Sequence, residues 1–145
     1  IAAALKFLNG VQKRRAVVFL VSDFLESRAV SKRGEAESFP LQFEKLLRAT
    51  ARHHDMVCVP VGDPAERELP DVGLVELEDP ETGELVLVDT SSAAVRKRFA
   101  AKASEENEAL KRFLLKTGID TLTIATDRPY IDEVRALFKR RARKR

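Results

Sequence analysis

The sequence has little of what secreted and membrane-spanning proteins usually carry. It contains one cysteine, Cys58, so no disulfide can form within the chain. No apolar run approaches the roughly 20 residues that cross a bilayer. In the opening segment 1–15 the apolar residues come before the basic ones, which is the reverse of a signal peptide. We therefore expect a cytoplasmic protein without a membrane partner.

The motifs of several common enzyme classes are also missing. The six glycines are scattered, so there is no glycine-rich phosphate-binding loop. Ser22 lacks the G-x-S-x-G context of a nucleophile elbow. Cys58 lies in the apolar run MVCVPV, where a thiol is a small hydrophobic group and a poor nucleophile. His53 and His54 stand at a predicted helix end and are interpreted as satisfying its last carbonyls. No residue is assigned a catalytic or cofactor-binding role.

The pattern of apolar residues predicts an α/β fold. The chain has 145 residues, of which 44% are hydrophobic and 34% charged, and this suits a single domain with its own core. Buried strands that alternate with helices predict three layers, a mostly parallel sheet with helices on both faces. Its crossovers should be right-handed. The chain begins with Ile1 and not with Met, which we interpret as part of a longer protein.

Two periodicities place the elements, since helices repeat every 3.6 residues and buried strands read as continuous apolar runs. Pro60 is awkward in a central strand and suggests an edge or a bulge. The polar stretch around Ser104 leaves open whether the long helical segment is one helix or two. The predicted elements are, in chain order, helix 1–12, strand 16–22, mobile loop 26–38, helix 41–53, strand 56–63, β-hairpin 73–90 turning at Pro80–Gly83, helix 91–117, strand 119–126 and a last helix opened by Arg128 and Pro129.

Each of the three predicted strands is followed by, or ends in, an aspartate: Asp23, Asp63 and Asp127. In an open parallel sheet, ligands bind beyond the carboxyl ends of the strands. Neighbouring strands lie about 4.8 Å apart, so these carboxylates could share one hard cation such as Mg²⁺. Asp63 and Asp127 also suit helix capping, because Pro64 and Pro129 follow them, and DPAE fits a capping box. We favour capping for these two and leave both roles open for Asp23.

Positive charge is concentrated in the basic tail, residues 139–145. These residues hold six of the 26 lysines and arginines, and the rest of the chain is mildly acidic although the whole carries a net charge of +3. Cations at a helix end interact favourably with the negative end of the helix dipole. A basic cluster can also contact nucleic acid. We favour the first interpretation, because no aromatic residue is interleaved with the cluster.

Three stretches resemble the bacterial domain of unknown function 58, whose members carry a von Willebrand factor A-like domain. They are ALKFLNGVQKRRAVVFLVSDFLE, RHHDMVCVPVGDPAERELPDVGLVELEDPETGELVLVDT and RPYIDEVRALFKRR. The resemblance covers essentially the whole chain but only the C-terminal part of the family's domain. It implies that the first three strands of the sheet are absent here. Strand 16–22 then becomes an apolar edge, through which we expect the chain to self-associate.

The resemblance also implies a divalent cation site at the carboxyl edge of the sheet. The usual ligands are an Asp-x-Ser-x-Ser motif, a Thr in a later loop, and an Asp that ends the fourth strand and acts through water. Asp23 matches that last Asp, with Ser22 at the rim of the site. The Asp-x-Ser-x-Ser motif does not occur in this chain, and the Thr would lie upstream of Ile1. Mg²⁺ or Mn²⁺ is therefore expected in the intact protein and not in this part of it.

The family is often found beside MoxR-type AAA+ ATPases. The resemblance therefore implies a non-enzymatic interaction or adaptor module, metal-assisted in the intact protein, that acts with such an ATPase in complex assembly. Two alternatives stay open. One is a Mg²⁺-dependent phosphate-handling enzyme that uses Asp23, Asp63 and Asp127 together. The other is association with nucleic acid through the basic tail, which would show a steep dependence on salt.

Overall fold

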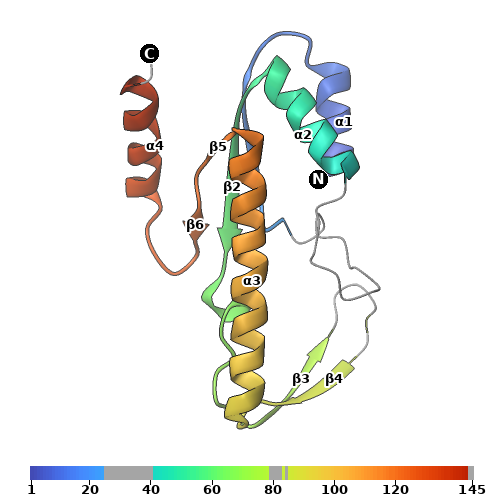
Figure 1. Cartoon of the computed structure of the whole chain (residues 1–145), viewed down its shortest axis with the longest axis vertical. Coiled ribbons are helices and arrows are strands. Elements are labelled where there is room, and N and C mark those ends of the chain that lie inside the picture. The colour runs from blue at the N-terminus through green and yellow to red at the C-terminus, as the bar shows by residue number, and fades with distance from the viewer. Residues whose placement is uncertain (25–40, 79–82, 84, 144–145) are drawn as a thin grey trace. The chain divides into compact units, whose positions relative to one another are not determined.

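A computed structural model describes residues 1–24, 41–78, 83 and 85–143 (Figure 1). The predicted loop 26–38 and most of the predicted turn Pro80–Gly83 lie outside the described residues. The chain divides into two compact units, one of residues 1–62 and 109–145 and one of residues 63–108. Within the described ranges, no helix combines the length and the apolar character needed to cross a bilayer.

The first unit contains a parallel sheet with β2 (Asp55–Gly62) at its centre. On one side β2 pairs with β1 (Val17–Ser22), in a register that places Val17 beside Asp55 and Ser22 beside Pro60. On its other side it pairs with β5 (Asp120–Thr121) and then with β6 (Ile124–Ala125). The predicted parallel sheet is thus confirmed in mixed α/β form. The predicted strand 119–126 is wrong in one respect, because it is two short strands.

Pro60 explains that interruption. The Cys58 carbonyl accepts a hydrogen bond from the Leu122 N–H, and the Gly62 carbonyl accepts one from the Thr126 N–H. Backbone groups two residues apart on a strand point to the same side, so the nitrogen of Pro60 faces the gap between β5 and β6. Proline has no N–H to donate there. The prediction of an edge position for Pro60 is therefore wrong, since β2 is central and its ladder is broken on one side only.

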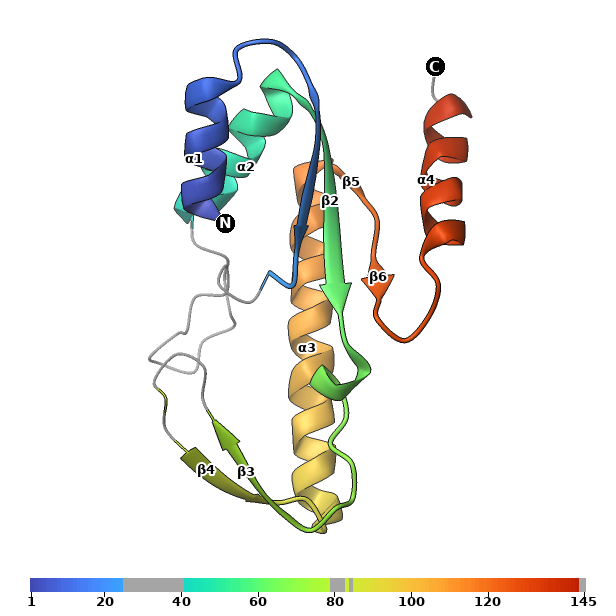
Figure 2. The same ribbon diagram turned by 180° about the vertical axis from the view of Figure 1, so that it is seen from behind.

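Helices pack against both faces of β2, whose side chains alternate between them (Figures 1 and 2). Met56 and Cys58 join a buried cluster with side chains from α1 (Ala2–Val11), α2 (Leu41–His53) and the end of α3 (Ala93–Thr117). Val57 and Val59 face the opposite way and pack with Leu137 of α4 (Ile131–Arg143). The helices on the first face contribute Leu5, Phe43, Leu47, Leu110, Phe113 and Leu114.

One face of β1 is left largely uncovered. Val17, Phe19 and Val21 are exposed, although they lie beside Asp55, Val57 and Val59 on the face that α4 covers. The helix α4 packs over β2 and the segment 122–124, and β1 carries no such cover among the described residues. The prediction of a strand buried on both faces is therefore wrong for β1.

The second unit holds a β-hairpin of β3 (Leu74–Glu78) and β4 (Leu85–Asp89), as the sequence predicts. Before it comes a short 3₁₀ helix, η2 (Pro64–Glu66). The helix α3 begins in this unit at Ala93 and continues without a break to Thr117, so the polar stretch around Ser104 does not divide it. Gly118 follows with φ of 70°, the left-handed conformation that commonly ends a helix.

Candidate functional site

The residues that end β1 form the rim of the predicted metal site. Ser22 is the last residue of the strand, and Asp23 follows it with an exposed side chain. The Ser22 hydroxyl donates to Asp23 Oδ1 at 3.3 Å and accepts from the Phe24 N–H at 3.0 Å. The hydroxyl and carboxylate oxygens are therefore held side by side at the carboxyl end of the strand, where the sequence places them.

Phe24 anchors this turn. It adopts a φ of 62°, which is unusual for a large side chain and costs about 1–2 kcal/mol. Its ring is fully buried and meets the Phe43 ring edge-on at 6.4 Å, and Phe43 in turn stacks on Phe113. Burying a ring of this size contributes about 1.5–3 kcal/mol, and an aromatic pair adds about 0.5–1.5 kcal/mol. The burial outweighs the backbone cost, so the buried Phe24 ring anchors the turn that carries Asp23.

The other two strand-end aspartates have different surroundings. Asp63 accepts from the Ala65 N–H at 2.8 Å, and Glu66 accepts from the Asp63 N–H at 3.4 Å, which confirms the predicted capping box. Asp127 lies exposed in the turn after β6. Because α4 begins at Ile131, Tyr130 takes the cap position, and the predicted capping by Asp127 is wrong. Within the described ranges, no three His, Cys, Asp or Glu side chains are grouped so that they could hold a metal ion.

Two predictions about reactive side chains have opposite outcomes. Cys58 is fully buried, and burial raises the pKa of its thiol to about 12. This confirms the prediction that Cys58 is a small hydrophobic group and a poor nucleophile. His53 Nε2 lies 3.1 Å from the Lys13 carbonyl oxygen, and His54 Nδ1 accepts from the Ala16 N–H at 3.4 Å. Both histidines thus bind the segment between α1 and β1 rather than the last carbonyls of α2, so the capping interpretation is wrong.

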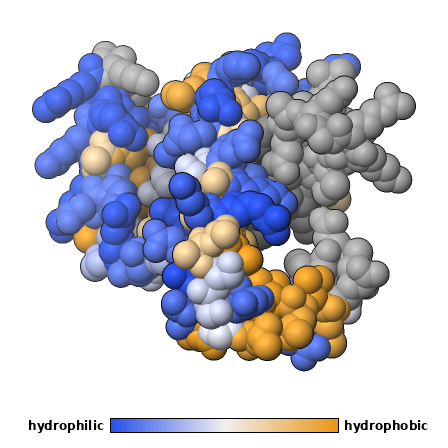
Figure 3. Space-filling view, turned by 60° about the horizontal axis from the view of Figure 1, so that its bottom comes forward, coloured by the Kyte–Doolittle hydropathy of each residue, from blue (hydrophilic) through white to orange (hydrophobic). Residues whose placement is uncertain are grey.

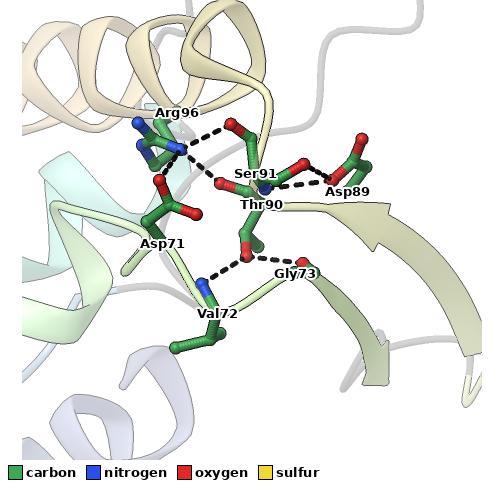
Figure 4. Close-up of polar contacts among 7 residues, drawn as sticks. All are labelled: Asp71, Val72, Gly73, Asp89, Thr90, Ser91 and Arg96. Carbon is green, nitrogen blue, oxygen red and sulfur yellow. Dashed lines mark hydrogen bonds and ion pairs between the residues drawn. The ribbon is translucent and has the colours of Figure 1, made fainter.

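In the second unit, Thr90 closes the open end of the hairpin (Figure 4). Its side chain is fully buried. Its N–H and its hydroxyl both donate to the Gly73 carbonyl oxygen, at 2.8 and 2.6 Å, and the hydroxyl accepts from the Val72 N–H at 3.2 Å. Gly73 has a φ of 83°, which glycine adopts without strain. One threonine therefore joins the start of β3 to the end of β4.

Arg96 ties this end of the hairpin to the first turn of α3. Its Nη1 donates to the carbonyl oxygens of Thr90 and Ser91, at 2.6 and 2.9 Å, and pairs with Asp71 Oδ2 at 3.0 Å (Figure 4). Asp89 accepts from the Ser91 hydroxyl at 2.5 Å and from the Ser91 N–H at 3.0 Å. These bonds lower the pKa of Asp89. These contacts hold the open end of the hairpin, its base, in one position. We call the hairpin held in this way the platform.

The outer face of this platform combines leucines with acids. The register pairs Leu74 with Asp89, Glu76 with Leu87 and Glu78 with Leu85, so these six residues share one face. Leu74 and Leu87 are 66% and 67% exposed. Figure 3 shows hydrophobic side chains gathered at the hairpin, along the lower edge of the view. We call this surface, made of Leu74, Glu76, Glu78, Leu85, Leu87 and Asp89, the acidic–apolar face.

The inner face of the same hairpin packs toward α3. Leu77 and Val88 line a cavity of about 220 Å³ together with Val95 and Phe99 of that helix. The hairpin thus has one apolar face toward a helix and another that no described element covers. The sequence predicts the hairpin but not this surface. The signal is in β4, which reads LVLVD and is apolar at both alternate positions, whereas a half-buried strand alternates.

Comparison with known proteins shows which family this chain belongs to. The family described as protein of unknown function DUF58 matches residues 1–109, which is most of the chain. This chain belongs to the DUF58 family. An uncharacterized protein of Mycobacterium avium is 32% identical to the DUF58 chain over 143 residues, covering 99% of this chain and 76% of that protein. Uncharacterized proteins of Mycobacterium bovis and Mycobacterium tuberculosis are 32% identical over 142 residues. No solved structure matches.

The extent of these matches matters for both candidate surfaces. The DUF58 chain spans only 40% of the length of the relatives from M. bovis and M. tuberculosis. The family match includes Ser22, Asp23 and the whole hairpin, whereas α4 lies beyond it. The rim of the predicted metal site and the acidic–apolar face therefore both lie within residues 1–109, the part of the DUF58 chain that matches the family.

Proposed function

We propose that the DUF58 chain is a protein-interaction module, an adaptor and not an enzyme, and that the acidic–apolar face of the hairpin binds its partner. The observation that carries this is the exposure of Leu74, Leu85 and Leu87 on a hairpin fixed at its base by Thr90. Contiguous apolar surface rimmed by polar residues is typical of protein-binding sites. A platform that is already ordered loses little conformational freedom on binding, which favours affinity.

The composition of the face defines the partner. Burying one exposed leucine contributes about 1.5–3 kcal/mol, so three of them supply the affinity once the cost of association is met. Glu76, Glu78 and Asp89 flank the leucines, and charges at the rim act on specificity and on the rate of encounter. The occupant is therefore a segment of the partner protein that carries apolar side chains together with lysine or arginine.

The resemblance stated above supplies an identity for that partner. It supports a MoxR-type AAA+ ATPase as the partner, acting in complex assembly. It also supports a von Willebrand A-like sheet, which the rest of the intact protein would complete. In that protein Ser22 and Asp23 would contribute to a Mg²⁺ or Mn²⁺ site that assists binding. The pairing of their oxygens at the end of β1 supports this part of the proposal.

A binding titration tests the proposal. Purified MoxR-type ATPase is titrated onto the unaltered chain and onto a double variant, Leu74→Ser with Leu87→Ser, whose fold is checked by circular dichroism. Leu115→Ser is the matched control, because Leu115 is 79% exposed and lies outside the face. We expect the double variant to lose roughly tenfold or more in affinity and the control to match the unaltered chain. Equal affinity for all three proteins, or no binding to any, would contradict the proposal.

The metal-assisted part has a separate test. Mg²⁺ and Mn²⁺ are titrated by calorimetry into a longer DUF58 protein that includes the upstream strands, with and without Asp23→Ala. We expect saturable binding in the unaltered protein and its loss in the variant. Unchanged binding in the variant would remove Asp23 from the site.

A further inference from the structure

The strand β4 is apolar and exposed on both faces of the hairpin. Leu85, Val86 and Leu87 follow one another along the strand, and they are 62%, 50% and 67% exposed. Successive side chains of a strand point to opposite faces, so neither face of β4 is covered at these three positions. A continuous apolar run is typical of a strand with neighbours on both sides. Among the described residues, however, β4 pairs with β3 alone.

The hydrogen-bond pattern of the hairpin shows which backbone groups face the free edge of β4. The Thr90 N–H donates to the Gly73 carbonyl oxygen at 2.8 Å, and these two residues stand just before the first pair of the ladder. In an antiparallel ladder, pairs that are hydrogen-bonded alternate with pairs that are not. Counted from that bond, the backbone N–H and C=O groups of Leu85, Leu87 and Asp89 point away from β3. They are spaced as the partners of a further strand would be.

The two free edges of the hairpin differ in charge. The strand β3 carries Glu76 and Glu78, both exposed, and charged side chains on an edge strand oppose pairing with another strand. The strand β4 has no charged residue from Leu85 to Val88. Its one acid, Asp89, ends the strand at the base of the platform. The edge of β4 is therefore the edge that is open to a further strand.

We propose that the partner binds by strand addition, in which an extended segment of the partner protein pairs with the free edge of β4. This inference rests on the proposed function and specifies how the hairpin holds its partner. In this mode of binding, backbone hydrogen bonds supply affinity and alternate side chains supply specificity. The backbone groups of Leu85, Leu87 and Asp89 form the hydrogen bonds. The hairpin then becomes a sheet of three strands, with β4 at its centre.

The side chains of β4 define the sequence of the added segment. Neighbouring strands lie about 4.8 Å apart, so side chains of the segment lie beside Leu85, Leu87 and Asp89 on the outer face and beside Val86 on the inner face. Apolar residues match the two leucines and the valine. A lysine or arginine matches Asp89, because opposite charges on neighbouring strands attract. The occupant is therefore an extended apolar segment with a basic residue at one end.

Hydrogen–deuterium exchange read residue by residue, with and without a MoxR-type ATPase, tests this mode of binding. An added strand protects the N–H groups at the edge that it joins, so we expect exchange at Leu85, Leu87 and Asp89 to slow roughly tenfold or more. Exchange at Leu74 and Glu76, whose N–H groups point to the opposite edge, should slow less. A helix laid across the acidic–apolar face would pair with neither edge. Equal slowing at both edges would therefore overturn strand addition.

Proline variants separate the backbone contact from the side chain. Leu87→Pro removes an N–H that faces the free edge and breaks no bond to β3, whereas Leu87→Ser removes the same side chain and keeps the N–H. We expect Leu87→Pro to bind the ATPase about tenfold more weakly than Leu87→Ser. Glu76→Pro and Glu76→Ser are the matched control pair, because Glu76 lies opposite Leu87 with its N–H toward the edge of β3. Their affinities should agree within about twofold.

The outcomes separate this inference from the proposed function. Binding with equal affinity for Leu87→Pro and Leu87→Ser overturns strand addition but leaves the hairpin as the binding surface. No binding of the ATPase to the unaltered chain overturns both. Should circular dichroism show that Leu87→Pro does not fold, the exchange pattern of the unaltered chain still decides.

Discussion

Arg141 and Asp55, which are 86 residues apart in the sequence, form a two-pronged ion pair. Nη2 lies 2.6 Å from Oδ1, and Nη1 lies 3.1 Å from Oδ2. Nε of the same arginine lies 2.8 Å from Asp120 Oδ2. Burial lowers the pKa of Arg141, but the hydrogen bonds that it donates to both aspartates outweigh this effect and raise that pKa above its ordinary value. The contact ties α4 to the amino ends of β2 and β5.

Removing this arginine should destabilise the first unit. Arg141→Ala breaks three charge-assisted bonds and leaves two aspartates facing each other. We expect a loss of about 1–3 kcal/mol in the free energy of unfolding, the lower end reflecting solvent screening of partly exposed groups. Urea unfolding followed by circular dichroism measures it. Arg143→Ala, on an exposed neighbour in the same helix, should change stability by less than about 0.5 kcal/mol, and equal effects of the two would show that the ion pair is not structural.

This contact also shows what the sequence could not reveal about the basic tail. Composition indicates a helix end rich in cations, and α4 does extend to Arg143. Which of these cations is structural depends on the distant Asp55 and Asp120, and only the folded sheet brings them together. Features that depend only on residues close in the sequence were predicted more reliably. The capping box at Asp63 and the hairpin follow from neighbouring residues and are confirmed, whereas the bare face of β1 and the split after β5 depend on partners far along the chain.

The hydrogen bonds at Asp89 predict a measurable pKa. The Ser91 hydroxyl and then the Ser91 N–H favour the ionised carboxylate, so its pKa lies below the ordinary value. Ser91→Ala should therefore raise the pKa of Asp89, as followed by NMR titration of its side-chain carbon. Because the folded-state pKa is depressed, the stabilisation is present above the ordinary pKa and is lost as pH falls through the folded-state value. An unchanged pKa in Ser91→Ala would contradict this assignment.

Cys58 should be inert in the folded protein. Burial raises its pKa to about 12, so almost no thiolate is present near neutral pH. We expect no reaction with Ellman's reagent in buffer and full reaction in urea. The raised pKa also means that stability is complete below the ordinary value of 9.0 and declines as pH rises from there toward 12. Rapid reaction without denaturant would show that the strand opens.

The edge strand β1 should cause self-association. Among the described residues it pairs only with β2, and Val17, Phe19 and Val21 are exposed along it. An unpaired apolar edge is a template for another strand, and a lysine placed on it opposes such pairing. We expect light scattering to show dimers or larger species at high concentration, and Val21→Lys to shift them toward monomer while Leu115→Lys does not. A monomer at every concentration would disprove this expectation.

The most direct measurement of the proposed function is hydrogen–deuterium exchange of the DUF58 chain with and without a MoxR-type ATPase. The hairpin is the proposed contact, so backbone amides of β3 and β4 should exchange more slowly in the complex. Amides of β1 and of α4 should exchange at the same rate in both samples. Protection confined to β1, or no protection anywhere at saturating ATPase, would contradict the hairpin as the binding surface.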